Sequence, residues 1–284
     1  MTILRNAFEK HLILQRYSPK TNKAYLHAVK GLAYFFNQSP DKLPDEKIQD
    51  YLRYLIEDRK YSWSTCNVTF CGIKCFYDNV LHRSTELMIP PRPKQKRLPT
   101  ILSQNEVSKL LNTCTNLKHK ALLLAVYSAG LRVSEVVSLQ AVHIERSRRM
   151  IRVEQGKGRK DRYTVLSGTL LAELENYWRE YHPGDWLFFG KDKKKPMPIS
   201  TAQQIYYTAK RRAGITKGRG IHTLRHCFAT HLMEQGVQPY AIKRMMGHKA
   251  LATTAGYIHV SNQFLSTIKS PLDNLEGNQQ KRLQ

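Results

Sequence analysis

The sequence predicts a mainly α-helical protein with a small β-sheet, an α+β fold divided into two domains. Three observations favour this class: the first 87 residues show helical periodicity, a proline-rich basic segment follows, and two short β-favouring segments lie among helices in the second half. A chain of 284 residues is long enough for about two domains. We expect a helical domain over 1–87, a linker over 88–100, a second domain over 101–260 and a tail over 261–284.

The N-terminal domain is predicted to contain four amphipathic helices separated by turn signals. Ser18 and Pro19 offer an N-cap followed by proline in the first turn, which is typical of a helix start. The expected helices cover Phe8 to Leu14, Thr21 to Phe36, a segment starting at Pro44, and a segment from Ser62 or Ser64 to about Leu81. Apolar residues at helical spacing mark the expected buried face of the last helix: Val68, Phe70, Ile73, Phe76, Tyr77 and Val80.

The segment from Met88 to Thr100 has the sequence MIPPRPKQKRLPT, with four prolines among its cations. Proline restricts φ and blocks helix continuation, so this segment is expected to be an extended linker. A basic linker between two basic domains suits a chain that wraps around a nucleic-acid duplex. A plain solvated spacer is the alternative interpretation.

The C-terminal domain is predicted to mix helices with one hairpin. Ser103 and Glu106 form the pattern of a capping box, and the segment from Lys118 to Ala129 is apolar enough for a central buried helix. Two β-favouring segments are joined by the glycine-bearing stretch QGKGRKDR, which indicates a hairpin. The expected strands are Met150 to Glu154 and Tyr163 to Leu166, and further helices are expected at Thr169 to Tyr181, Ser200 to Ala213 and Ile221 to Gly236.

The charge of the chain points to a polyanionic partner. Its 46 Lys and Arg outnumber its 22 Asp and Glu, a net charge of +24, and the cations recur along the whole sequence. This predicts a nucleic-acid binder. A cationic surface used for solubility or loose ribosome association is the alternative, and a membrane surface is less favoured because no basic amphipathic helix stands out.

The sequence favours a soluble, intracellular protein. No apolar run approaches the roughly twenty residues that span a bilayer, and the N-terminus is charged where a signal peptide is apolar. The five cysteines lack CxxC spacing, which suits a reducing cytosol. We interpret Cys66, Cys71 and Cys75 as small buried hydrophobes and not as metal ligands.

The stretch IHTLRHCFATHLMEQG raises the question of a metal site, because it combines histidines, a thiol and an arginine. Its polar members are His222, Arg225, His226, Cys227 and His231. Histidines about one turn apart suit zinc or iron. A guanidinium, however, repels a divalent cation and forks two hydrogen bonds onto a phosphate. We therefore predict phosphate binding and no metal here, with His226 and His231 as supporting or core histidines.

Cofactors are not expected elsewhere in the chain either. Two-metal nucleases need clustered carboxylates, and this acid-poor sequence has no convincing cluster. The stretch GKGRKD does not fit the P-loop pattern, so nucleotide hydrolysis loses support. The predicted chemistry therefore uses no metal and no other cofactor.

Attack on a phosphodiester without a metal needs a cationic clamp, a proton donor for the leaving oxygen and an activated nucleophile. Two arginines can hold the phosphate, a lysine can donate the proton, and imidazoles can ease a proton from a phenol. The chain offers each type in its C-terminal half: Arg132, Lys157, His222, Arg225, His248 and Tyr257.

Four motifs resemble the tyrosine recombinase (phage integrase) family and are most similar to its Xer-type and integron-type members. They occur in the family's order and approximate spacing: SAGLRVSEVVSL, RVEQGKGRKDRYTVL, IHTLRHCFATHL and MGHKALATTAGYIHV. The N-terminal helices are similar to the family's core-binding, SAM-like domain, so the resemblance covers nearly the whole chain. It implies a site-specific DNA recombinase that cuts and rejoins DNA through a 3′-phosphotyrosyl intermediate, without metal or ATP.

The resemblance also implies roles for individual residues. Arg132 and Arg225 would bind the scissile phosphate, and Lys157 would be the general acid to the 5′-oxygen, with Lys160 of the same hairpin as the alternative. His222 would assist proton transfer at the nucleophile. The remaining assignments are His248 as a phosphate ligand, Glu135 as a structural support and Tyr257 as the nucleophile, in preference to Tyr163, Tyr206, Tyr207 and Tyr240.

Partners follow from the same resemblance. It implies double-stranded DNA with specific sites, four protomers on two duplexes, passage through a Holliday junction, and a monomer or weak dimer when free. It also implies a cytoplasmic, nucleoid-associated protein of a prokaryote. Cations of the linker and hairpin are expected to contact DNA: Lys94, Lys96, Arg97, Arg159, Lys160 and Arg162.

Two features of the C-terminus depart from or extend the family pattern. Gly256 directly precedes Tyr257 and lowers helix propensity, so the segment that carries the nucleophile is expected to order only on DNA or in the assembled complex. The resemblance implies that Phe264 to Leu275 docks on a neighbouring protomer. A type IB topoisomerase and a non-catalytic architectural DNA-binding protein are the alternative functions.

Overall fold

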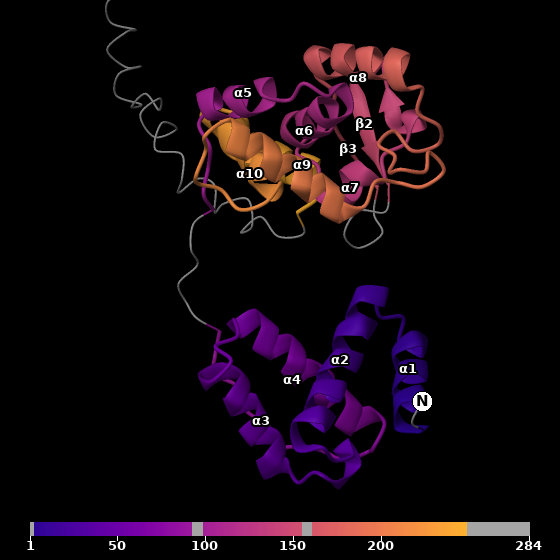
Figure 1. Cartoon of the computed structure of the whole chain (residues 1–284), viewed down its shortest axis with the longest axis vertical. Coiled ribbons are helices and arrows are strands. Elements are labelled where there is room, and N and C mark those ends of the chain that lie inside the picture. The colour runs from indigo at the N-terminus through magenta and orange to yellow at the C-terminus, as the bar shows by residue number, and fades with distance from the viewer. Residues whose placement is uncertain (1–2, 93–98, 155–160, 249–284) are drawn as a thin grey trace, which may run out of the picture. The chain divides into compact units, whose positions relative to one another are not determined.

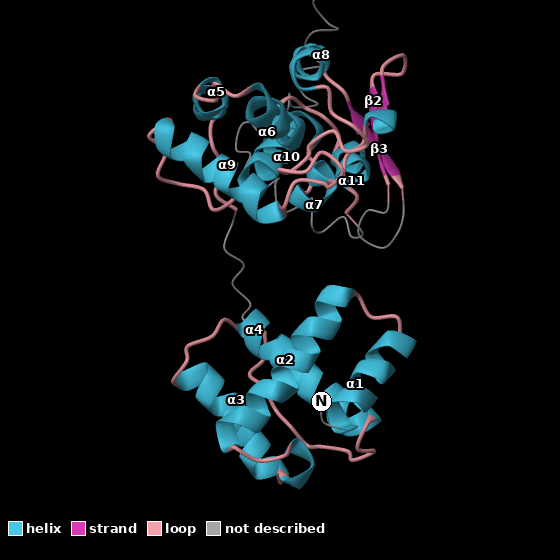
Figure 2. Ribbon diagram, turned by 45° about the vertical axis from the view of Figure 1, so that its right-hand side comes forward, coloured by secondary structure: helices cyan, strands magenta, loops and turns pink. Residues whose placement is uncertain are grey.

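The computed structural model describes residues 3–92, 99–154 and 161–248, and it divides the chain into two compact units, Met1–Lys96 and Arg97–Gln284 (Figure 1). Each unit has its own hydrophobic core. Among the described residues, helices dominate both units and strands occur in the second (Figure 2), which confirms the mainly helical α+β class. The boundary between the units falls inside the 88–100 segment.

In its described part, the first unit consists of helices. They are α1 (Ile3–Leu14), α2 (Pro19–Phe36), the short 3-10 helix η1 (Pro40–Lys42), α3 (Asp45–Glu57) and α4 (Trp63–Asn79). Two helix starts are explained by serine caps: Ser18 Oγ accepts from the backbone N–H of Thr21 at 3.1 Å, and Ser62 Oγ accepts from that of Thr65 at 3.3 Å. The central helix α2 packs against α1, α3 and α4 and so organises the core of this unit.

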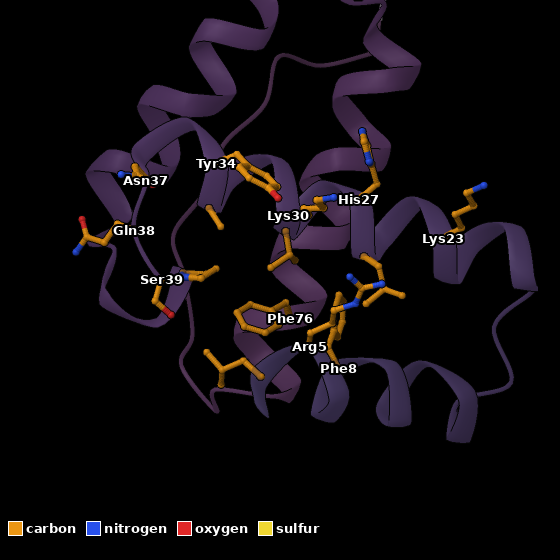
Figure 3. A pocket seen from close by; sticks show the side chains of 15 residues that line it. Arg5, Phe8, Lys23, His27, Lys30, Tyr34, Asn37, Gln38, Ser39 and Phe76 are labelled. Atoms are coloured by element: carbon orange, nitrogen blue, oxygen red, sulfur yellow. The ribbon is translucent and has the colours of Figure 1, made fainter. Parts of the chain in front are cut away.

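A cavity of about 780 Å³ opens in the first unit, lined by α1, α2, the η1 region and Phe76 of α4. Phe8 and Phe76 meet edge to face in its wall, with ring centroids 5.2 Å apart. Figure 3 shows cations around it, and Lys30 lies over the Tyr34 ring at 5.1 Å. The charged or ionisable side chains of the lining are Arg5, Lys23, His27 and Lys30, together with the phenol of Tyr34. The lining of this cavity therefore combines aromatic rings with basic side chains.

The chain beyond α4 stays attached to the first unit as far as Pro90. Gln49 exchanges two hydrogen bonds with the backbone of Met88, at 2.9 and 3.0 Å. Trp63 Nε1 donates to the Pro90 carbonyl at 2.8 Å. The first residues of the predicted linker are therefore held by the first unit.

The second unit surrounds a buried central helix with helices and a small sheet. Its helices are α5 (Gln104–Asn112), α6 (Leu117–Ala129), α7 (Val133–Val137), η2 (Ala141–His143), α8 (Gly168–Tyr181), α9 (Ile199–Arg212), α10 (His222–Glu234) and α11 (Pro239–Met246), and its strands are β1 (Ile144–Glu145), β2 (Met150–Val153) and β3 (Arg162–Val165). Helix α6 packs against α8, α10, α7, α9 and β3, which explains why it is apolar on nearly every face.

The sheet is antiparallel in the order β1-β2-β3, and β2 pairs with β3 from Met150 opposite Val165 to Val153 opposite Arg162. The hairpin predicted from the sequence is confirmed. Burial alternates along β3, with Arg162 and Thr164 buried and the two residues between and after them exposed. Helix α11 packs against β3, and this contact brings the end of α11 to the inward face of the strand.

Most expected helices are found within a few residues of their predicted bounds. The sequence reasoning missed α7, α11, β1 and the 3-10 helices η1 and η2, because segments of two to eight residues carry too few periods. Val68 was expected to be buried, and it is 40% exposed. It lies two positions after the buried Cys66, which places it on the opposite face of α4.

No helix in the described ranges has both the length and the apolarity that crossing a bilayer needs.

Candidate active site

Arg132 lies at the turn between α6 and α7. Gly130 ends α6 in the left-handed region with φ 61°, a conformation that favours glycine. A Cβ at this position would also collide with the ring of Phe228. Arg132 is the N-cap residue of α7, and its backbone N–H donates to Glu135 Oε2 at 2.7 Å. The turn therefore fixes the backbone from which the guanidinium of Arg132 extends.

Glu135 is a buried carboxylate shared by three arginines. Its Oε1 accepts from Arg132 Nη1 at 2.6 Å and from Arg162 Nη1 at 2.8 Å, and its Oε2 accepts from Arg162 Nη2 at 2.7 Å. Arg225 Nη1 lies 3.8 Å from Oε2. Burial raises the pKa of Glu135, but the hydrogen bonds and charge of Arg162, followed by the hydrogen bonds of Arg132, lower it to about 2. Three guanidiniums facing one carboxylate leave an excess of positive charge that suits an oxyanion.

Arg225 extends from α10 and is itself buried, with 4% of its surface exposed. Its Nη1 donates to the Gly130 carbonyl, and its Nη2 donates to the Met246 carbonyl at 2.6 Å. The start of α10 is fixed by α9, because Gln203 Oε1 accepts from the Ile221 backbone N–H at 3.0 Å. The guanidinium is thus held between the α6–α7 turn and the end of α11.

The C-terminal turn of α11, residues 245–247, binds all three arginines. Gly247 closes it in the left-handed region with φ 61°. Three consecutive carbonyls each accept a hydrogen bond from a different guanidinium: Met245 O from Arg162 Nε (2.7 Å), Met246 O from Arg225 Nη2 (2.6 Å) and Gly247 O from Arg132 Nη2 (3.1 Å). We call this segment the 245–247 turn. It joins residues from α7, β3 and α10 into one cluster.

His248 follows the 245–247 turn and lies beside Arg225, with its Nε2 3.3 Å from Arg225 Nη2. Because a guanidinium only donates, Nε2 accepts in this contact, and the ring proton belongs on Nδ1. Burial, followed by the charges of Arg225, Arg132, Arg162 and His226, lowers the pKa of His248 to about 4. The ring is therefore neutral at physiological pH.

The two other histidines of the site lie on α10. His222 is the exposed first residue of the helix, and its pKa is lowered by partial desolvation and by the charges of Arg225 and Arg132, against the opposite effect of Glu135. His226 is more enclosed, and desolvation, His222 and Arg225 lower its pKa to about 4. The lowered pKa values favour the neutral form of both rings.

The remaining members of the α10 stretch belong to the core. His231 is buried, its Nε2 donates to the Leu102 carbonyl at 3.0 Å, and its Nδ1 lies 2.9 Å from the hydroxyl of Tyr127. Cys227 is buried, its Sγ accepts from the Leu102 backbone N–H at 3.3 Å, and burial raises its pKa to about 11. His231 is thus a core histidine, as expected. Among the residues of 3–92, 99–154 and 161–248, no cluster of His, Cys, Asp or Glu is arranged to hold a metal ion.

The structure brings five of the predicted residues together: Arg132, Glu135, His222, Arg225 and His248. Other predicted residues lie outside the described ranges: Lys94, Lys96, Arg97, Lys157, Arg159, Lys160 and Tyr257, as do Gly256 and the tail from Phe264. Among the competing tyrosines, Tyr206 is fully buried and burial raises its pKa, which disfavours it as a nucleophile. Tyr163, Tyr207 and Tyr240 are 40%, 46% and 66% exposed.

Arg162 was expected at the DNA surface, and the structure places it elsewhere. Its side chain is 7% exposed and its guanidinium is committed to Glu135 and to the 245–247 turn. All three of its guanidinium nitrogens donate to partners inside the fold, so the side chain does not extend to the surface. The inward orientation of Arg162 could have been predicted from the sequence, because alternation along β3 puts it on the same face as Thr164 and Leu166. The binding role of the 245–247 carbonyls had no such signal.

Comparison with known proteins identifies two family matches. Residues 100–263 match the phage integrase family, and residues 4–87 match the phage integrase N-terminal SAM-like domain. A putative integrase/recombinase of Sinorhizobium fredii is 36% identical over 97% of this chain and 90% of its own length. The tyrosine recombinase XerA of Pyrococcus horikoshii is 31% identical over 91% of this chain and 89% of its own length.

Solved structures show the same similarity. A crystal structure of XerA recombinase covers 93% of this chain and 95% of its own, with 26% identity and a TM-score of 0.55. A lambda integrase tetramer bound to a Holliday junction covers 94% of this chain and 78% of its own, with 14% identity and a TM-score of 0.73. At that identity, the second match shows the fold alone.

Proposed function

Since the chain belongs to the phage integrase family and is a tyrosine-type site-specific DNA recombinase, we propose that it cuts and rejoins DNA through a 3′-phosphotyrosyl intermediate formed by Tyr257. The observation that carries this proposal is the cationic cluster in the second unit. Arg132 and Arg225 converge there on Glu135 and the 245–247 turn, beside His248.

Arg132 and Arg225 form the proposed phosphate clamp. In the described part of the chain, Arg132 uses two side-chain N–H groups, on Glu135 and on the Gly247 carbonyl, out of the five that a guanidinium carries. Its side chain is 20% exposed, so it can reach a bound phosphate. As Tyr257 attacks, negative charge grows on the non-bridging oxygens, and fixed guanidiniums stabilise it without reorganising. His248, neutral with a proton on Nδ1, is the proposed third ligand of the phosphate.

The proposed cleavage step moves one proton to the enzyme and one to the leaving group. The Tyr257 oxygen bonds to phosphorus, the bond from phosphorus to the 5′-oxygen breaks, and Lys157 gives its proton to that oxygen. The ring of His222, whose lowered pKa favours its neutral form, accepts the phenolic proton. In the reverse step Lys157 takes the proton of a 5′-hydroxyl of another strand as that oxygen bonds to phosphorus, the bond from phosphorus to Tyr257 breaks, and His222 returns its proton to the phenolic oxygen. The phosphotyrosine bond conserves the energy of the phosphodiester, so the proposed reaction requires no ATP. The guanidiniums of the clamp supply the positive charge that a metal ion would otherwise supply.

Duplex DNA is the proposed partner, and four protomers on two sites are the proposed assembly. The net charge of +24 supports strong backbone attraction with a steep salt dependence. The lambda integrase that shares this fold is a tetramer bound to a Holliday junction, which supports the assembly. We propose that Lys94, Lys96, Arg97, Arg159 and Lys160 contribute backbone contacts, and that the enzyme acts on nucleoid DNA in a prokaryotic cytoplasm.

The test is a covalent-adduct assay in EDTA. Duplexes selected from a random-sequence pool for binding to the protein are prepared with a nick, so that cleavage releases a short strand and traps the enzyme on DNA. We expect a denaturation-resistant adduct from the wild type and from Tyr240→Phe, and none from Tyr257→Phe. An adduct that requires Mg²⁺, or one that persists in Tyr257→Phe, would overturn the mechanism.

A relaxation assay separates this activity from that of a type IB topoisomerase, which uses the same chemistry on one duplex. We expect supercoiled plasmid without a selected site to stay supercoiled. Relaxation of such a plasmid at a comparable rate would favour the topoisomerase alternative.

A further inference from the structure

Arg162 occupies a more enclosed position than Arg152 of the neighbouring strand. It is the first residue of β3, and strand alternation turns its side chain inward with Thr164. Its side chain is 7% exposed, against 35% for Arg152 on the neighbouring strand β2. Burying a guanidinium is costly unless every charge and donor finds a partner. The contacts of Arg162 meet that requirement.

All three nitrogens of the Arg162 guanidinium are used, and they join two elements. Nη1 and Nη2 donate to the two oxygens of Glu135 at 2.8 and 2.7 Å, the parallel fork that suits a carboxylate. Nε donates to the Met245 carbonyl at 2.7 Å. A Cβ at position 247 would lie 2.9 Å from Arg162 Cδ, so Gly247 lets the stem of Arg162 pass. The planar head therefore holds α7 and the end of α11 in one fixed relation.

Both of these anchors also hold the phosphate clamp. Glu135 accepts from the backbone and from the guanidinium of Arg132 at 2.7 and 2.6 Å. The 245–247 turn accepts from Arg132 and Arg225 through the two carbonyls that follow Met245. A shift of Glu135 or of this turn would therefore reorient both clamp guanidiniums and His248.

We infer that Arg162 is a positioning residue for DNA cleavage: it fixes Glu135 and the 245–247 turn, and through them the geometry of the phosphate clamp, without contacting DNA. The inference rests on the proposed function, because it concerns the same reaction. Arg162 also follows Lys157, the proposed general acid, by five residues in the sequence.

The first test compares Arg162→Lys and Arg162→Met with the wild type, using Arg152→Met as the matched control. Arg152 lies on the adjacent strand, where it pairs with Glu154 at 2.8 Å near the surface. With saturating nicked DNA, we expect adduct formation to slow about 100-fold in Arg162→Met, since small misplacements of reacting groups have effects of that size. Arg162→Lys should recover little of the rate, because an ammonium cannot fork onto both Glu135 oxygens. The control should stay within about 3-fold of the wild type.

DNA affinity separates positioning from direct contact. If Arg162 acts through Glu135, the Kd for uncleaved DNA and its salt dependence stay unchanged in both Arg162 variants. If Arg162 contacts a phosphate, binding weakens and the slope of log K against log salt falls by about 1. That second result, or a rate recovered by lysine, would overturn the inference.

A double-mutant comparison tests whether Arg162 acts through Glu135. We expect the double variant Arg162→Met with Glu135→Gln to cleave no more slowly than Glu135→Gln alone, because Glu135→Gln already removes the carboxylate that Arg162 holds. Additive losses would contradict the inference. Thermal unfolding of each variant, with rates measured well below its Tm, distinguishes misplacement from loss of folded enzyme.

A titration independent of cleavage keeps the two proposals separable. His248 faces Arg132 from α7, Arg162 from β3, and Arg225 and His226 from α10, and these charges and its burial lower its pKa. NMR titration of the His248 ring in the free protein should therefore show a higher pKa in Arg162→Met than in the wild type or Arg152→Met. An unchanged His248 pKa in Arg162→Met would count against the inference, whether or not the wild type forms an adduct. If the His248 pKa rises but the wild type forms no adduct at Tyr257, the proposed function fails and the inference about the contacts of Arg162 stands.

Discussion

Among the described residues, both units carry surface cations, but buried arginines occur in the second unit. In the described part of the first unit no arginine is buried: Arg53 pairs with Asp50 at the surface, and Arg59 lies over the Tyr61 ring. In the second unit, Arg162 and Arg225 are buried and share one carboxylate. Surface cations attract DNA whatever their exact orientation, whereas the buried ones have a geometry that each neighbour helps to set. The same residue type therefore supplies affinity in one environment and, as we propose, catalysis in the other.

The largest expected effect comes from changing the shape of a buried cation while keeping its charge. Arg225→Lys loses the paired contacts with the Gly130 and Met246 carbonyls, so we expect adduct formation to slow at least about 100-fold, as when an oxyanion donor is removed. The exposed Arg244→Lys on α11 is the matched control and should leave the rate within about 3-fold. Equal effects of the two changes would remove the distinction between buried and surface cations.

The next effect concerns the turn that supports the clamp. Gly130→Ala places a methyl group against Phe228 in a left-handed conformation, and we expect it to lower the free energy of unfolding by about 2–4 kcal/mol. Gly214→Ala is the control, because Gly214 has φ 67° and nothing within 4 Å of the added carbon. It should lose only about 1 kcal/mol. Urea unfolding of both variants measures the difference, and similar losses would show that the packing against Phe228 is unimportant.

A smaller effect follows from pH. His226 and His248 have pKa values of about 4 in the folded protein against 6.5 ordinarily, so the unfolded chain binds more protons below pH 6.5. Stability should be constant above pH 6.5 and fall by on the order of 1–2 kcal/mol per histidine by pH 5. Glu135, with a pKa near 2, extends the loss below pH 4.5. Urea unfolding between pH 5 and 7.5 checks this, and His226→Gln should flatten the decline. A flat profile in the wild type would contradict the burial of these rings.

The smallest effect belongs to the first unit. Asp50 and Arg53 form an ion pair at 3.1 Å with side chains 59% and 65% exposed. We expect Asp50→Asn to change the free energy of unfolding by less than about 0.5 kcal/mol. Glu135→Gln, its counterpart in the second unit, should lose about 3 kcal/mol or more, because it leaves buried guanidiniums without their carboxylate. Thermal unfolding of the two variants side by side measures the contrast directly.

Local signals in the sequence predicted much of the fold. The Ser18 cap, the capping box of Ser103 with Glu106, and the hairpin strands were read from neighbouring residues, and all are found in the structure. Such features depend on hydrogen bonds within a few positions of chain, so the sequence carries them in full. Short elements such as α7 and α11 were missed because their form depends on what packs against them.

The sequence predicted individual residues of the candidate site but not the contacts that join them. The motif positions singled out Arg132, Arg225 and His248, and the structure brings these side chains together. The inward orientation of Arg162 and the three carbonyls of the 245–247 turn come from contacts between elements as far as 115 residues apart in the chain. No local pattern encodes the partners of contacts at that range. Alternation along β3 indicated that Arg162 points inward, but its charge led to the expectation that it lies at the DNA surface.

The most direct test of the proposed chemistry is the identity of the residue joined to DNA. The trapped adduct is digested with nuclease and trypsin, and the peptide that retains a nucleotide is sequenced by mass spectrometry. We predict the peptide of residues 250–269, in which Tyr257 is the single tyrosine, with the phosphate on its phenolic oxygen. A nucleotide on any other residue, such as Tyr240 or a serine, would contradict cleavage through Tyr257.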